Sequence, residues 1–200
     1  MMSAAPLPAA EPSLATADDA RIDWRNLGWV ALALAVMIAA ILDDSDWFLN
    51  YVHVIAGVLW TGIDLFMGFV IGPVLRRVDF AARRAIAMRL MPRMLFILPT
   101  VSVITGTAGW FLAERRGYLD LAYPEFWWVA AALAITTVLT IQGVFVLLPT
   151  NLMVYFEMRK AEPDGARIGR MMRRYVRSVA FQGVLQVSII VIMARFVTGL

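Results

Sequence analysis

The sequence predicts an all-α fold, a polytopic bundle of transmembrane helices. Of its 200 residues, 61% are hydrophobic and only 16% are charged, and the mean hydropathy is +0.73. Soluble domains are nearer to half apolar and a quarter charged. This composition excludes a soluble globular enzyme, a nucleic-acid-binding domain and a disordered protein, so we expect no nucleic-acid partner and a lipid bilayer as the surroundings.

Five apolar segments account for the composition. A spanning helix needs about 20 mostly apolar residues. Four segments meet this length: 48–75, 94–113, 126–149 and 178–198. The fifth, 27–42, is uninterrupted but would be only about 24 Å long at about 1.5 Å per residue. Trp24 and Trp47 flank it as interfacial tryptophans do. We expect it to be the first of five spans, with a surface or re-entrant helix as the alternative.

The basic residues predict the orientation of the bundle. The segments 76–93 and 159–177 hold thirteen of the 18 Lys and Arg residues. Cytoplasmic loops are enriched in these residues, so both segments are expected on the cytoplasmic side. With five spans, Arg21 and Arg25 join them, which gives 15 basic residues inside and 3 outside. We therefore expect the N-terminus inside and the C-terminus outside.

The same two segments have a second interpretation. Topology alone accounts for their charge, but they could also bind anionic lipid head groups. The candidate arginines are Arg76, Arg77, Arg83, Arg84, Arg173 and Arg174. Both segments are expected to be partly helical. A helix over 79–90 is expected to end near Pro92, and 170–177 is expected to extend the last span.

The chain divides into a tail and one domain. Residues 1–23 are rich in Ala, Pro, Ser and Asp, which predicts a flexible cytoplasmic tail, and they lack the pattern of a secretory signal. Residues 24–200 form a single transmembrane domain.

The chain has no cysteine and one histidine. This excludes disulfides, cysteine-based metal sites and a two-histidine haem site within one chain.

The second predicted span carries the most informative pattern. At 100° per residue, one face collects six of its residues: His53, Gly57, Trp60, Asp64, Met67 and Gly68. That face should point into the bundle, because a lone charge facing lipid is costly. On the last span, Met193 matches the depth of His53, and Gln186 matches that of Asp64. Gln182 and Gln186 share one face and are expected to hydrogen-bond between helices.

Four interpretations of this face remain open. His53 could be an axial haem ligand, with Met193 as a candidate sixth ligand. His53 could also bind a divalent metal together with outer carboxylates such as Asp43, Asp44 or Asp46. His53 and Asp64 could be stations on a proton path. In the fourth interpretation, both residues only hydrogen-bond within the bundle. Methionines near the third span, Met88 and Met91 among them, could bind Cu(I), although core packing is their more common role.

One run in this region resembles several small bacterial membrane families. It reads His53-x-x-Ala-Gly57-x-x-Trp60-x-Gly62, followed by Phe66, Gly68 and Pro73-Val-Leu-Arg-Arg. It resembles the opening helix of CopD-like copper-resistance proteins, of the membrane domain of bacterial urate oxidases and of HemJ-type protoporphyrinogen oxidases. The resemblance covers about residues 48–113, including Leu98-Pro-Thr and Thr105-Gly-Thr-Ala-Gly-Trp.

The resemblance implies a bundle of four or five helices in the bacterial inner membrane. For the HemJ-type proteins it implies haem at the position of His53, and for the CopD-like proteins it implies copper passage. We therefore expect a pocket formed by His53, Trp60 and Asp64, with Met193, to bind haem b in a redox-linked role. Any electron-transfer partner would be a separate chain, because Cys-x-x-Cys-His is absent. The alternative is a metal or proton permeation unit, a homo-oligomer or an accessory subunit of a membrane complex.

Overall fold

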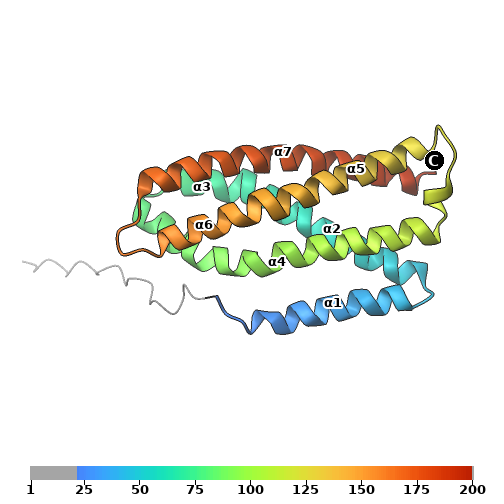
Figure 1. Cartoon of the computed structure of the whole chain (residues 1–200), viewed down its shortest axis with the longest axis horizontal. Coiled ribbons are helices and arrows are strands. Elements are labelled where there is room, and N and C mark those ends of the chain that lie inside the picture. The colour runs from blue at the N-terminus through green and yellow to red at the C-terminus, as the bar shows by residue number, and fades with distance from the viewer. Residues whose placement is uncertain (1–21, 200) are drawn as a thin grey trace, which may run out of the picture.

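The computed structural model describes residues 22–199, and nearly all of them are helical. The helices run side by side along the long axis of the molecule (Figure 1). The predicted flexible tail, 1–23, lies outside the described residues except for its last two positions. The all-α helical bundle is thus confirmed for the part of the chain that the structure describes.

Four continuous helical rods are long and apolar enough to cross a membrane, which confirms a multi-pass membrane protein. The first rod consists of α2 (Asp46–Phe66), the π-helical turn η1 (Met67–Ile71) and α3 (Gly72–Arg77). The second is α4 (Phe80–Arg115). The third consists of α5 (Phe126–Gln142), the π-helical turn η3 (Gly143–Leu147) and α6 (Leu148–Met158), and the fourth is α7 (Gly165–Val197).

Two shorter elements complete the described chain. Helix α1 (Asn26–Leu42) has 17 residues, and it lies along α4 on the side away from α7 (Figure 1). The 3₁₀ turn η2 (Tyr118–Asp120) belongs to the connection between α4 and α5. The first predicted span is therefore a helix, but it is shorter than the other four rods.

The two basic segments are largely helical, as predicted. Helix α4 begins at Phe80, where the Asp79 carboxylate accepts a 2.8 Å hydrogen bond from the amide of Ala82. The prediction that this helix ends near Pro92 is wrong, because α4 continues through Pro92 and Pro99. Transmembrane helices tolerate proline when the surrounding structure compensates for the missing hydrogen bond. The polar segment and the third span therefore form one rod.

Both basic segments lie at the same end of the bundle, which we call the basic end (Figure 1). Arg84 joins them: it donates 2.9 Å and 3.0 Å hydrogen bonds to the carbonyls of Met158 and Lys160. A packed apolar cluster lies beneath this contact, and Met88, Met158 and Ile168 are among its buried members, with Met91 against it. The core-packing interpretation of Met88 and Met91 therefore agrees with their surroundings.

The two π-helical turns share a position relative to proline. Pro73 and Pro149 each follow the end of a turn by two residues. Proline cannot donate the helical hydrogen bond, and its ring crowds the preceding turn. A widened turn accommodates this defect. Both turns contact α7, and such turns occur often at functional sites. We therefore expect a functional site on the surface of α7 that faces these two turns.

Candidate functional site: the polar centre of the bundle

A carboxyl group is buried among the spanning helices. Asp64 on α2 is 8% exposed, although it lies well inside a rod of 32 residues. Its Oδ2 atom accepts hydrogen bonds from two side-chain amides of α7, those of Gln182 and Gln186, the latter at 2.7 Å. The indole of Trp60, one turn earlier on α2, is also a hydrogen-bond partner. The partners that the structure describes for Asp64 are all uncharged.

The two glutamines reach Asp64 because they are four residues apart on one face of α7. Their side chains are 3% and 1% exposed. Each uses its Nε2 group on Asp64, and each leaves its Oε1 atom buried without a hydrogen-bond partner. Buried acceptors are usually paired, so two adjacent unpaired ones require an explanation, such as bound water or an ion. The predicted interhelical hydrogen bonding of this pair is confirmed.

A second polar pair lies on the basic side of this centre. The hydroxyl of Tyr175 on α7 is paired with the side chain of Asn151 on α6, and it is close enough to Asp64 to interact with its charge. Neither residue is among the site residues predicted above. A signal was present, however, because Tyr175 precedes Gln182 by seven residues and therefore lies on the same face of α7.

His53 faces a different helix. Its Nδ1 atom lies 2.9 Å from the carbonyl oxygen of Thr105 on α4. A carbonyl can only accept, so Nδ1 carries the proton and the lone pair is on Nε2. The ring packs against Gly109, where an added Cβ would lie only 2.7 Å from His53 Cε1. His53 and Asp64 therefore share a face of α2 but contact α4 and α7 respectively.

A glycine contact holds α2 close to α4 beside the histidine. A Cβ at Gly57 would lie 3.4 Å from the Thr105 methyl group. Small residues allow helices to approach in this way. Buried apolar residues of both helices belong to one cluster beside this contact: Val52 and Ala56 of α2, and Ile104 and Ala108 of α4. The contact explains why the His53 ring can reach the backbone of the neighbouring helix.

The hydrogen bond of His53 has one feature in common with ligating histidines. Ligating histidines commonly donate their second nitrogen to a backbone carbonyl, as His53 does here. The pairing of His53 with Met193 stays a prediction: Met193 lies on α7, and no polar contact joins the two among the described residues. Residues 22–199 contain no cluster of three His, Cys, Asp or Glu side chains that could hold a metal ion. A divalent site at His53 would need other ligands.

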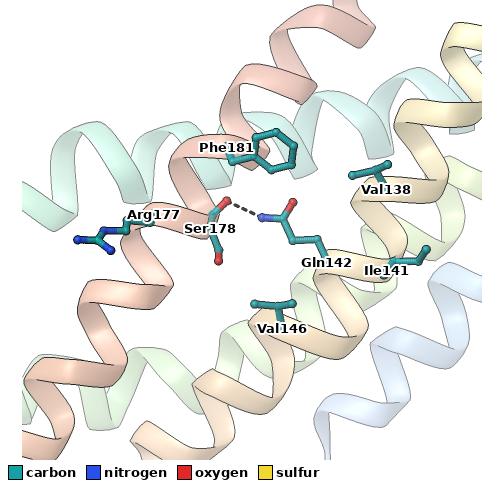
Figure 2. Close-up of a pocket in the computed structure, with 7 residues that line it drawn as sticks. All are labelled: Val138, Ile141, Gln142, Val146, Arg177, Ser178 and Phe181. Carbon is teal, nitrogen blue, oxygen red and sulfur yellow. Dashed lines mark hydrogen bonds between the residues drawn. The ribbon is translucent and has the colours of Figure 1, made fainter.

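Two pockets are found elsewhere in the molecule. One, of about 310 Å³, is lined by Asn26, Trp29, Arg93 and Ile97. The other, of about 420 Å³, lies between α5–η3 and α7 (Figure 2). Neither includes His53 or Asp64, so the polar centre is not arranged around one of these two spaces.

The arginines proposed for lipid head groups differ in their surroundings. Arg83 donates to the carbonyls of Leu75 and Val78, and Arg84 bridges the two basic segments. The other four are partly or largely exposed at the basic end: Arg76, Arg77, Arg173 and Arg174. Arg83 and Arg84 thus hold the backbone, which leaves less of their guanidinium surface for a lipid phosphate.

Comparison with protein-family models, with curated proteins and with solved structures finds no match to this chain. The resemblance of residues 48–113 to known membrane families therefore rests on its short motif alone.

Proposed function

We propose that this membrane protein transfers protons across the bilayer and that Asp64 binds the proton midway. The observation that carries the proposal is a buried carboxyl whose described partners are all uncharged. Ionisable groups inside a membrane are costly and mark ion or proton pathways by default. A carboxyl without a fixed counter-charge can change its protonation state without breaking an ion pair.

Two further protonatable groups lie along the bundle on either side of Asp64. His53 is eleven residues earlier on α2, about 16 Å towards the end opposite the basic end. Tyr175 is seven residues before Gln182 on α7, about 10 Å towards the basic end. Histidine exchanges protons near neutral pH, and a tyrosine hydroxyl can both donate and accept. Ordered water between these groups would complete a path.

The unpaired oxygens of Gln182 and Gln186 support the same role. They lie on side chains that already contact Asp64, and they can accept only from a donor that the described residues do not supply. Water or hydronium is such a donor, and it would also be the immediate proton source for the carboxylate. The transfer step converts the carboxylate to a carboxylic acid and the hydronium to water.

The test is proton flux in proteoliposomes under an imposed pH gradient, followed with an internal pH-sensitive dye. D64N keeps an acceptor for the glutamine amides but cannot titrate. We expect the wild type to dissipate the gradient faster than empty liposomes and D64N to slow this at least tenfold. D46N is the matched control, because Asp46 is half-exposed at the end of α2 and its ion pairs lie at the surface. Wild-type flux equal to that of empty liposomes refutes the proposal.

A second candidate function rests on His53 alone. Because Nδ1 donates to Thr105, the imidazole lone pair, which is the group that binds iron, lies on Nε2, and haem b bound there would supply one-electron redox chemistry. The absorption spectrum of protein purified in mild detergent distinguishes this candidate from the first. A Soret band that H53A abolishes supports haem binding. Absence of the band even after haem is supplied rules it out.

A further inference from the structure

We infer that the groove between α5–η3 and α7 is a binding site for an anionic glycerophospholipid with a hydroxyl-bearing head group, such as phosphatidylglycerol. The groove has a volume of about 420 Å³, which is within the range of small-molecule sites. Its walls are mostly apolar, with a polar group at the centre (Figure 2). The inference is independent of Asp64 and of the proposed proton transfer.

The polar group at the centre is the carboxamide of Gln142. This side chain is 8% exposed, and its Nε2 group donates to the carbonyl of Ser178 across the groove (Figure 2). Its Oε1 atom is buried and has no hydrogen-bond partner. A buried acceptor without a donor is unfavourable. A ligand that brings a hydroxyl donor into the groove would remove this cost.

The charge at the rim selects the class of ligand. Arg177 precedes Ser178 and is exposed, and its guanidinium extends away from the apolar walls (Figure 2). Further arginines follow along α7 towards the basic end: Arg174, Arg173 and Arg170. A positive field of this kind attracts anionic lipids, and arginine binds phosphate well because its donors match two oxygens.

The apolar walls suit an acyl chain. Val138, Ile141 and Phe181 are between 41% and 54% exposed, so they present a continuous apolar surface to the bilayer. A lipid would place its phosphate on Arg177, a head-group hydroxyl on Gln142 Oε1 and one chain along these residues. A choline head group has no donor for Gln142. An ethanolamine head group has a donor, but its lipid has no net negative charge.

Native mass spectrometry of the full-length protein in detergent tests this inference, with phosphatidylglycerol, phosphatidylethanolamine and phosphatidylcholine as probes. We expect one phosphatidylglycerol per chain to bind more tightly than either other lipid. Loss of one interfacial arginine should weaken it about fivefold, so R177Q should show this effect. R170Q is the matched control, since Arg170 is also exposed and lies two turns away on the same face of α7.

A second variant keeps the test decisive if R177Q fails to fold. I141W fills the groove with a larger side chain and leaves every arginine in place, so it should remove the tight site. Melting temperatures identify variants that have lost their fold. Equal binding of the three lipids, a preference for phosphatidylethanolamine, equal weakening by R177Q and R170Q, or undiminished binding to folded I141W would overturn the inference.

Discussion

Substitution of Gly109 by alanine tests the placement of His53 against α4. The new Cβ would lie 2.7 Å from His53 Cε1 and 3.0 Å from Nδ1. Real Cβ atoms essentially never approach so closely, so the ring must move. It cannot move freely, because the 2.9 Å hydrogen bond to the Thr105 carbonyl holds it on this side. The substitution therefore forces a choice between a clash and a broken hydrogen bond.

The expected cost follows from three contributions. Overpacking a core costs about 1–3 kcal/mol, and an interhelical hydrogen bond in a membrane protein is worth about 0.6 kcal/mol. Replacing glycine within a helix by alanine stabilises the folded state by about 0.5–1 kcal/mol, which offsets part of this cost. The free energy of unfolding should therefore fall by about 0.6–3 kcal/mol, with a midpoint near 2 kcal/mol.

The assay is reversible unfolding of purified protein in mixed micelles, followed by circular dichroism. G106A is the matched control, because Gly106 lies three residues earlier on α4 and an added Cβ there meets no atom within 4 Å. In the H53A background the clash is gone, so G109A should become neutral or stabilising. This reversal of sign separates a specific contact from a general defect in α4.

Two results would refute this account of His53. If G109A and G106A have the same stability, the ring does not occupy the space beside Gly109. If G109A costs as much in the H53A background as in the wild type, the cost comes from another contact.

Three further predictions concern the polar centre and the basic end. Q186L should lower stability by about 1 kcal/mol, and a double-mutant cycle with D64L should show coupling, whereas additive effects would mean that the pair does not interact. R84A should speed amide hydrogen exchange in 159–164 about fivefold, because two hydrogen bonds that join the basic segments are lost; unchanged exchange would contradict this. Asp164 caps the start of α7, and its hydrogen bond from the Arg167 amide lowers the pKa of its carboxyl. The stability that this cap gives to α7 is therefore present above the ordinary aspartate pKa and is lost as the pH falls through the lowered pKa. At such low pH, amide exchange at the start of α7 should become faster in the wild type but not in D164N.

The sequence predicted the elements well because each span must be about 20 apolar residues long. The four long rods and the shorter α1 fall where hydropathy places them. The helical extensions into the basic segments were also expected. The predicted end near Pro92 is wrong because proline does not always end a transmembrane helix, and α4 continues through two of them.

The candidate site was only partly predictable, because depth along the membrane is not the same as adjacency. Depth matching gave Gln186 the same depth as Asp64, and the structure shows that the two side chains are hydrogen-bonded. The same reasoning matched Met193 to the depth of His53, and that pairing stays a prediction, while the His53 ring itself packs against α4. Which helix lies beside each face depends on close approach at Gly57 and Gly109, and single-residue spacing does not reveal those contacts.

Proton flux through reconstituted D64N and D46N tests the central claim most directly. The proposed role of Asp64 predicts that wild type and D46N dissipate an imposed pH gradient at similar rates and that folded D64N does so at least tenfold more slowly. Equal flux through folded D64N and the wild type would contradict that role.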